Sequence, residues 1–465
     1  MSLYNRYQSP FTWRYGDQEL RQIWSEEHKR RLWRQLWVWL AEVEQGFGLV
    51  SQDQVEQLQA AVDAVDVERS LAVETRIQHD LMAEVKVYAA QCPDAGGIIH
   101  LGATSTDIKD NATVLQVKES LDVIVQELRR VLVLQAARID QYADLPIIAF
   151  THLQPAEPST LGYRLAVYGQ DMLTIWHQLQ ALVRGLRGKG FRGAVGTSAS
   201  FVDLLGRDNL AAFEEELEKK LGIGFFPVVN QTYPRQQDLQ VLNALAGLGA
   251  VLSKFAFDLR FLQSPPIAEW SEPFGDEQVG SSAMPFKRNP IQSEKINSLA
   301  RMLAQLPRVA WDNAAHSLLE RTLDDSANRR TILPEGFLIT SELLGVVRVL
   351  LEDMNFYPRS MDDNLEKYGA FAATERVLMA LGKAGADRQQ MHERIRRHAL
   401  QAWKAVQAGE ENPLADFLAS DEVLTGYLPS DDLISLLDVK HYLGNAPGRS
   451  REMAAAIQSA VKESK

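Results

Sequence analysis

Apolar residues recur at alternating steps of four and three along most of the chain, which is the spacing of one helix face. In residues 110–143 the positions that carry this pattern are Val117, Leu121, Ile124, Leu128 and Val131. Four further segments behave similarly: residues 160–186, 239–262, 293–319 and 331–354. Several of these predicted helices would extend for roughly 30–45 Å at the standard helical rise. The pattern therefore predicts an all-α protein built on long helices.

Some of these segments are apolar on more than one face. Residues 244–252, for example, read ALAGLGAVL. A helix that is apolar most of the way round must be buried on most sides. One monomer rarely supplies enough cover for five such helices, so we expect an obligate homo-oligomer whose helices bundle across subunits.

Shorter helices are expected on both sides of this central part. A helix is predicted from Ser25, a possible N-cap followed by two acidic residues. Residues 54–65 and 72–90 also have helical patterns, residues 355–368 read as a short polar linker, and more charged helices follow to residue 465. The sequence thus predicts three domains: a helical N-terminal domain (1–105), a central long-helix bundle (106–355) and a small helical C-terminal domain (356–465).

Composition narrows the class of protein. Of the 465 residues 46% are hydrophobic and 24% are charged, as in soluble globular proteins. The net charge of −12 argues against a nucleic-acid or anionic-membrane binder. Any anionic ligand would therefore need a local cationic pocket. With Cys92 as the only cysteine, an intrachain disulfide and a thiolate metal cluster are excluded.

The expected location is the cytoplasm. The first ten residues, MSLYNRYQSP, lack the basic start and apolar run of a signal peptide. No stretch approaches the roughly 18 uninterrupted apolar residues of a membrane span.

Two loop or turn segments carry groups suited to proton transfer or anion binding. Residues 145–155 form an extended apolar approach to a polar tip that holds His152, where an imidazole is well placed to transfer a proton. Residues 98–107 form a turn whose hydroxyls either cap the following helix or hold a carboxylate or phosphate. Both segments also have plain structural interpretations. Gln78, His79 and Asp80 are a third candidate, although a neighbouring imidazole and carboxylate on a helix are more often a solvated or core pair.

Residues 280–290, GSSAMPFKRNP, combine a flexible first half with two cations and an amide. Such a segment suits a mobile loop that closes over an anion, and a solvated surface loop is the alternative. Residues 320–330, ERTLDDSANRR, add Arg321, Ser326 and Arg330, a plausible phosphate clamp. Metal, redox-cofactor and Walker-type nucleotide motifs are absent from the sequence. Together these segments favour a cofactor-free enzyme that acts on a multiply anionic small molecule by acid–base chemistry.

The 280–290 segment closely resembles the signature loop of the fumarase/aspartase superfamily, whose members eliminate fumarate from a succinyl group. Other segments resemble the adenylosuccinate lyase family, in the same order along the chain: WRY at 13–15, HD at 79–80, HLGATS at 100–105, FTHLQP at 150–155, GTSASF at 196–201, QTY at 231–233 and ERTLDDSANRR at 320–330. The resemblance covers most of the chain and is nearer the animal-type form than the commoner bacterial one. The 320–330 segment separates it from argininosuccinate lyase and fumarase.

The resemblance implies a fumarase/aspartase-like fold and a homotetramer with active sites built from three chains. The implied reaction is a β-elimination of fumarate from adenylosuccinate, giving AMP, and from the succinyl-aminoimidazole carboxamide ribotide (SAICAR), giving AICAR. Ser281 would be the general base and His152 the general acid. Lys287 and Asn289 would stabilise the carbanion.

The resemblance also implies a substrate-binding set. His79 would lie near the acid histidine or the phosphate. The residues expected around the phosphate, base, succinyl and ring groups are Arg14, Tyr15, Asp80, Thr104, Ser105, Gln231, Arg321, Ser326 and Arg330.

Three positions depart from the family pattern. Gln78 and Lys295 stand where animal-type enzymes carry arginine, so a forked, bidentate cation is replaced by a neutral amide and by a point charge. Phe286 stands where tyrosine or histidine is common, which removes at most one polar contact. Local sequence does not decide between Ser281 and Ser282 as the base; the family pattern favours Ser281.

Two other functions compete with this interpretation. One is another fumarate-releasing lyase of the superfamily, acting on a different amine. The other is a non-catalytic structural relative, and the intact set of His152, Ser281, Lys287 and Asn289 argues against it.

Overall fold

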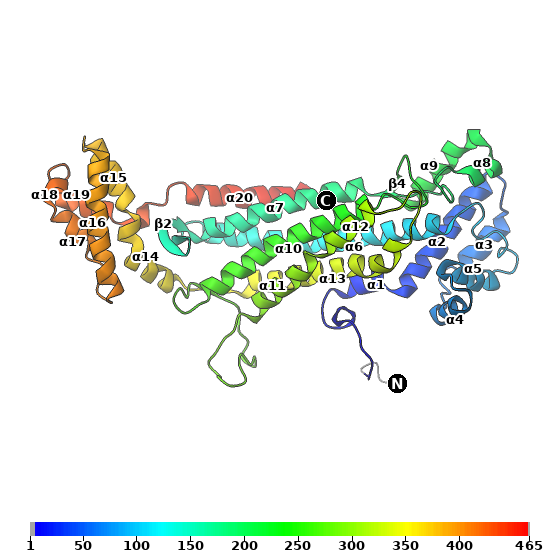
Figure 1. The fold of residues 1–465 in the computed structure, drawn as a ribbon, viewed down its shortest axis with the longest axis horizontal. Coiled ribbons are helices and arrows are strands. Elements are labelled where there is room, and N and C mark those ends of the chain that lie inside the picture. Colours follow the sequence, from blue (N-terminus) through cyan, green and yellow to red (C-terminus); the bar gives the residue numbers. More distant parts are fainter. Residues whose placement is uncertain (1–4, 464–465) are drawn as a thin grey trace. The chain divides into compact units, whose positions relative to one another are not determined.

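The computed structural model describes residues 5–463 of the chain (Figure 1). The first four residues of the N-terminal segment discussed above lie outside this range. Helices dominate the described residues, and their strands form only three two-stranded pairs. The predicted all-α fold class is therefore confirmed.

The chain divides into two compact units. Unit 1 consists of the described part of Met1–Leu128 with Ile175–Ala250 and Ser298–Gly345, and unit 2 consists of Arg129–Thr174, Val251–Asn297 and the described part of Val346–Lys465. Five helices contribute residues to both units: α6 (Ser105–Gln141), α7 (Leu161–Gly185), α10 (Gln236–Leu262), α11 (Ile291–Leu303) and α13 (Asp324–Asp353). The division into three domains stays a prediction.

The remaining elements belong to one unit each. Unit 1 holds η2 (Pro10–Thr12), α1 (Gln18–Ile23), α2 (Glu26–Gly46), α3 (Gln52–Ala61), α4 (Val67–Ile77), α5 (Asp80–Gln91), β3 (Arg187–Gly188), α8 (Ala199–Leu205), η3 (Arg207–Asn209), α9 (Leu210–Leu221), β4 (Gly224–Phe225) and α12 (Leu306–Ala315). Unit 2 holds β1 (Pro146–Thr151), β2 (Gln154–Thr160), β5 (Trp270–Ser271), β6 (Asn355–Phe356), α14 (Pro358–Ala372), α15 (Thr374–Lys383), α16 (Arg388–Gln407), α17 (Leu414–Ala419), α18 (Glu422–Thr425), α19 (Ser430–Leu436), η4 (Val439–His441) and α20 (Ala446–Glu463).

Four of the five predicted long helices are present as α6, α7, α10 and α13, and the fifth prediction is wrong. The segment predicted at 293–319 is divided into α11 and α12, with Gln305 between them at the start of α12. Pro307 lies in the first turn of α12, where its missing N–H is tolerated, but it could not continue α11.

The predicted single helix at 72–90 is also divided, into α4 and α5. Gln78 has a φ of 56° and ends α4 in the left-handed conformation, and its backbone N–H donates to the carbonyl of Glu74. His79 has extended backbone and caps the N-terminus of α5. The break at this pair is therefore what places the His79 and Asp80 side chains at a helix start.

The predicted polar linker at 355–368 is wrong as well. Most of it is α14, which begins at Pro358, a residue favoured in the first turn of a helix. Met361 and Leu365, four residues apart, are buried on one face of α14. Leu365 belongs to the hydrophobic core around which the short helices α15–α19 gather (Figure 1).

A β-hairpin of unit 2 is braced against this same core. Strands β1 and β2 are antiparallel, with Thr151 paired to Gln154 across a two-residue tip. Ile148 of β1 is buried in the core with Leu365. Arg164 of α7 donates from Nη2 to the carbonyl of Ile148 at 2.9 Å and from Nη1 to the Glu269 carboxylate at 2.6 Å. The hairpin is thus fixed both through its side chains and through its backbone.

Among the described residues, α10 is the one helix long and apolar enough to cross a membrane by length and composition alone. Half of its most apolar window is buried inside the protein. Core helices meet the same criterion, so this is weak evidence for a membrane span.

Candidate active site

The break between α4 and α5 places His79 beside the start of α6. The Nδ1 atom of His79 accepts a hydrogen bond from the backbone N–H of Met82 at 3.2 Å, as an N-cap side chain does. The other ring nitrogen, Nε2, lies 3.5 Å from the hydroxyl of Ser105. Two residues that belong to separate sequence motifs are therefore in contact.

Asp80, the residue after His79, binds two cations. Its carboxylate accepts from Lys109 Nζ at 2.7 and 3.0 Å and from Arg330 Nη2 at 3.0 Å. Burial raises the pKa of the Asp80 carboxyl, but the charge and hydrogen bonds of Lys109, with the charge of Arg330, outweigh it and leave the pKa below its usual value. Asp80 is therefore held ionised between the two cations.

The start of α6 is organised by Asp107 rather than by a hydroxyl. The buried Asp107 carboxylate accepts the backbone N–H of Thr104 at 2.8 Å and pairs with the buried Lys189 ammonium. Asp107 thus takes up the backbone N–H that precedes α6, and the Ser105 hydroxyl contacts His79. The Thr106 hydroxyl donates to the carbonyl of Gln231 at 2.5 Å, which brings the 231–233 segment to the same helix end.

A buried ionic network holds the 320–330 segment beside that segment. Asp325 accepts from Arg321 Nη1 at 2.9 Å and from Arg235 Nε at 2.6 Å. Arg235 also donates to both oxygens of Asp110 in α6. Burial raises the pKa of Asp325, but Arg235, Arg329 and Arg321 together lower it below its usual value. The network fixes Arg321 relative to the start of α6.

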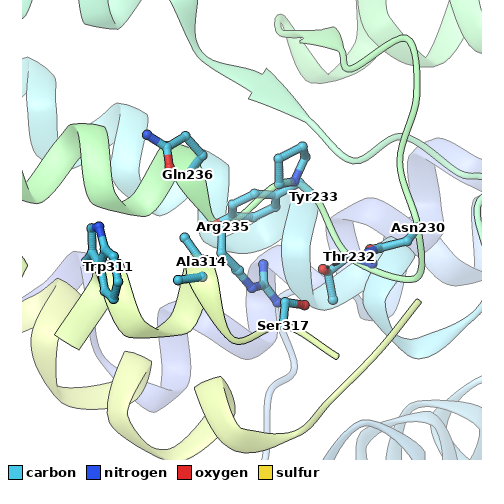
Figure 2. Close-up of a pocket in the computed structure, with 10 residues that line it drawn as sticks. Asn230, Thr232, Tyr233, Arg235, Gln236, Trp311, Ala314 and Ser317 are labelled. Carbon is cyan, nitrogen blue, oxygen red and sulfur yellow. Dashed lines mark hydrogen bonds between the residues drawn. The ribbon is translucent and has the colours of Figure 1, made fainter. Parts of the chain in front are cut away.

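A cavity of about 320 Å³ lies next to this network (Figure 2). Arg235 and Tyr233 line one part of it, and Trp311 and Ser317 line another. Gln231 is not part of its lining, although both of its neighbours in sequence are. None of the predicted site residues lines this cavity, so it is not the predicted substrate site.

Arg14 and Tyr15 lie in the segment that joins η2 to α1. The Arg14 guanidinium lies 5.7 Å from the ring centroid of Tyr15. The backbone N–H groups of the next two residues donate to Glu342 and Ser341 of α13. The segment is therefore tethered to the helix that also carries Ser326 and Arg330 near its start.

In unit 2, His152 occupies the tip of the β1–β2 hairpin. His152 and Leu153 have φ values of 53° and 60°, as both central residues of a type I′ turn do. Both side chains are exposed. The predicted position of an imidazole at a loop tip is confirmed.

The signature loop of unit 2 extends away from the helices that flank it (Figure 1). The Ser281 hydroxyl oxygen accepts from the backbone N–H groups of Met284 at 3.1 Å and Ala283 at 3.4 Å. The Asn289 amide donates to the carbonyl of Gly280 at 3.1 Å and closes the base of the loop. A Cβ at Gly280 would lie 2.2 Å from the Lys287 carbonyl oxygen, so only glycine fits there.

The predicted site residues thus form two sets. Unit 1 contains Arg14, Tyr15, His79, Asp80, Thr104, Ser105, Gln231, Arg321, Ser326 and Arg330, and unit 2 contains His152, Ser281, Lys287 and Asn289. Gln78 is exposed, and its amide donates to the carbonyl of Thr75 in its own helix. Among the described residues no group of three or more His, Cys, Asp or Glu side chains is arranged to hold a metal ion. Sequence reasoning had not singled out Lys109.

Two family models match the chain. The model described as "Lyase" matches residues 15–304, and the model described as "Adenylosuccinate lyase C-terminus" matches residues 370–452. An adenylosuccinate lyase of Schistosoma mansoni is 38% identical over 96% of this chain and 94% of its own length. The chain belongs to the adenylosuccinate lyase family. The resemblance drawn from the sequence motifs is thereby confirmed.

Other members of the adenylosuccinate lyase family give the same result. The relative from Schizosaccharomyces pombe is 38% identical, covering 96% of this chain and 94% of its own, and that from Pyrococcus abyssi is 34% identical, covering 98% of both. A crystal structure of fumarate lyase from Mesorhizobium sp. BNC1 matches with a TM-score of 0.84 and 25% identity, over 97% of this chain and 99% of the other. The fumarase-like fold is therefore confirmed together with the family.

Proposed function

We propose that this chain catalyses the β-elimination of fumarate from adenylosuccinate, giving AMP, and from SAICAR, giving AICAR. The observation that carries the proposal is the near full-length similarity to proteins named adenylosuccinate lyase, reinforced by the separate match to that family's C-terminal model. Both residue sets support the proposal. The unit 2 set has the groups for proton transfer, and the unit 1 set has the groups for holding the nucleotide.

The first step is removal of a proton from the succinyl carbon next to a carboxylate, with Ser281 as the base. A serine hydroxyl is a poor base unless its ionised form is stabilised. The two backbone N–H groups that point at the Ser281 oxygen would stabilise an alkoxide in the way that an oxyanion hole does. This geometry favours Ser281 over Ser282.

The electron pair released by that proton spreads into the carboxylate, where Lys287 and Asn289 would stabilise the added charge. The pair then forms the carbon–carbon double bond of fumarate as the carbon–nitrogen bond breaks. The electrons of the broken bond go to the nitrogen, which takes a proton from His152. The exposed hairpin tip leaves the His152 imidazole accessible to substrate. The reaction as written needs neither an oxidant nor a reductant.

The unit 1 set would hold the nucleotide. Arg321 and Arg330 supply guanidinium groups suited to phosphate, and Ser326 adds a hydroxyl. His79 and Ser105 present polar groups side by side at the start of α6. Arg14, Tyr15, Asp80, Thr104 and Gln231 complete the proposed substrate-binding set.

The proposed active form is a cytoplasmic homotetramer whose active sites combine residues of different chains. Large apolar side chains on the unit 2 parts of the long helices support an oligomer, because water would otherwise cover them. Those exposed by 41% or more are Val133, Val167, Phe257 and Val349. Light scattering coupled to size exclusion measures the mass of the particle, and a monomer at micromolar concentration would contradict this part of the proposal.

The decisive experiment is to add the purified protein to adenylosuccinate and to follow AMP and fumarate. Release of both in equal amounts is expected, and SAICAR is tested in parallel. Absence of turnover on both, with activity on another succinyl-amine, would favour a different lyase of the superfamily. Absence of turnover on every succinyl-amine would favour a non-catalytic relative.

A further inference from the structure

We propose that Lys109 is a substrate-affinity residue of this site, which supplies a second cation beside Arg330 for the phosphate monoester of the nucleotide. The inference deepens the proposed function and rests on it. It is based on the placement of Lys109, its shared carboxylate partner and the local balance of charge.

The placement follows from the geometry of α6. Lys109 lies four residues after Ser105, so the two side chains project from the same face of the helix, about one turn apart. Ser105 reaches His79, and Lys109 reaches Asp80, the next residue in the chain. The first turns of α6 and α5 are therefore joined through two adjacent contacts, one neutral and one ionic.

Asp80 is the common partner of Lys109 and Arg330. Both cations lie within 3.0 Å of its Oδ2 atom. The side chains of Lys109 and Arg330 are 29% and 56% exposed, whereas that of Asp80 is only 13% exposed. One carboxylate thus holds two cations together and leaves an excess of one positive charge on the accessible side.

A third cation lies close to this group. Lys29 of α2 has its pKa lowered mainly by burial, with smaller contributions from the charges of Arg30 and Arg330. Its own carboxylate partner is Glu26, at 2.5 Å. Glu26 therefore offsets the charge of Lys29, and the excess positive charge beside Asp80 is that of Lys109 and Arg330.

Gln78 does not contribute a charge here. It is a neutral amide whose donor is engaged with the carbonyl of Thr75 in α4. The cations that contact Asp80 come instead from α6 and α13, as Lys109 and Arg330.

A phosphate monoester dianion is the ligand that this arrangement suits best. It can accept from the exposed donors of Arg330 and Lys109 at once, while Asp80 keeps the two cations from moving apart. Because Lys109 is partly exposed, its attraction for the ligand is screened by salt. Loss of this cation should weaken phosphate binding about tenfold, and the loss should shrink as the ionic strength rises.

The test compares Lys109→Met with Lys109→Arg. The methionine variant keeps most of the length of the side chain but removes its charge, and the arginine variant keeps the charge. Lys118→Met is the matched control on the same helix, since Lys118 donates to the carbonyl of Gly222 and lies away from Asp80. KM and kcat are measured at low and high salt, and calorimetry gives the affinities for AMP and adenosine.

The expected result for Lys109→Met is an increase in KM and in the Kd of AMP of about tenfold at low salt, with kcat changed by less than about threefold. Adenosine affinity should not change, Lys109→Arg should restore most of the AMP affinity, and Lys118→Met should resemble the wild type. Unchanged AMP affinity in Lys109→Met would overturn the inference. A change in inhibition by fumarate without a change in AMP affinity would also overturn it, because Lys109 would then serve a carboxylate.

Failure of the proposed function is a separate result. If the wild type binds AMP but does not turn over adenylosuccinate, the proposed function fails, and the AMP affinities still decide the role of Lys109. If the wild type is active while Lys109→Met differs only in thermal stability, the proposed function stands and Lys109 is a structural partner of Asp80.

Discussion

The Nδ1 atom of His79 accepts the backbone N–H of Met82, three residues further along α5, at 3.2 Å. An atom that accepts this hydrogen bond cannot carry a proton. The neutral imidazole must therefore bear its proton on Nε2, the atom that faces the Ser105 hydroxyl. The helix cap thus selects the tautomer of a residue in the proposed site.

The tautomer can be measured directly. We expect the ¹⁵N spectrum of the neutral His79 ring to show a protonated Nε2 and an unprotonated Nδ1. The reverse assignment would contradict the cap. His79→Asn should preserve the cap and the melting temperature but lower kcat/KM by about tenfold or more, because asparagine caps helices well and lacks the distal donor. His79→Ala should in addition lose about 1 kcal/mol of stability.

The two serines of the signature loop should differ in their effect on turnover. Ser281→Ala is expected to lower kcat by at least about 10²-fold, because it removes the proposed base. Ser282→Ala should remain near the wild type and is the matched control. The melting temperature and particle mass of both variants should match those of the wild type. An inactive Ser282→Ala variant together with an active Ser281→Ala variant would show that the base has been assigned to the wrong residue.

Gly280 should be intolerant of any side chain. A Cβ there would meet the Lys287 carbonyl oxygen at 2.2 Å, so Gly280→Ala must move the backbone between Ser281 and Lys287. Displacement of about 1 Å in a catalytic group typically lowers the rate about 10²-fold. Gly275→Ala, between β5 and this loop and with no atom within 4 Å of its Cβ, is the control and should keep its activity. Equal kcat values for the two variants would contradict the close contact.

Buried Glu44 of α2 should make stability fall as the pH rises. Neither carboxylate oxygen has a hydrogen-bond partner within residues 5–463, and burial raises the pKa of Glu44 to about 8. Between the ordinary value of 4.5 and about 8, the folded state keeps a proton that the unfolded chain releases. The free energy of unfolding must then decrease across that window, by up to about 1.4 kcal/mol per pH unit.

Chemical denaturation at pH 5, 7 and 9 measures this slope. Glu44→Gln should flatten it and should be more stable than the wild type at pH 9, because a neutral amide replaces a carboxyl that would otherwise ionise while buried. Glu27→Gln, which changes an exposed carboxyl on the same helix, should retain the slope. A wild-type slope that persists in Glu44→Gln would assign the pH dependence to other groups.

The long helices could be predicted because apolar spacing is a local property, and α6, α7, α10 and α13 follow from it. The breaks between α4 and α5 and between α11 and α12 could not be predicted in this way, because they depend on caps and backbone conformation. Gln78 adopts a left-handed conformation, which glutamine does not favour. His79 caps α5, although histidine is an uncommon cap. Pro307 favours a break between α11 and α12, but the apolar residues on both sides of it continue the helical spacing and therefore predict one helix.

The candidate site was predicted from motifs rather than from spacing. Residues such as His79 and Ser105 were each ambiguous alone, and only the fold shows that they touch. Lys109 was missed because its role depends on which helix packs beside its own. Its partner Asp80 is 29 residues away in sequence, and the i, i+4 relation to Ser105 has meaning only once α6 is known to begin at Ser105.

The tip of the β1–β2 hairpin holds the proposed acid, His152, in a backbone conformation that lowers stability. His152 and Leu153 both occupy left-handed backbone, which disfavours a side chain by about 1 kcal/mol at each position. Glycine would relieve that strain, so His152→Gly should raise the melting temperature while kcat falls by about 10²-fold or more. A random search for thermostable variants of this protein would therefore favour substitutions that remove its proposed acid. Such a search must select for turnover as well as for heat resistance.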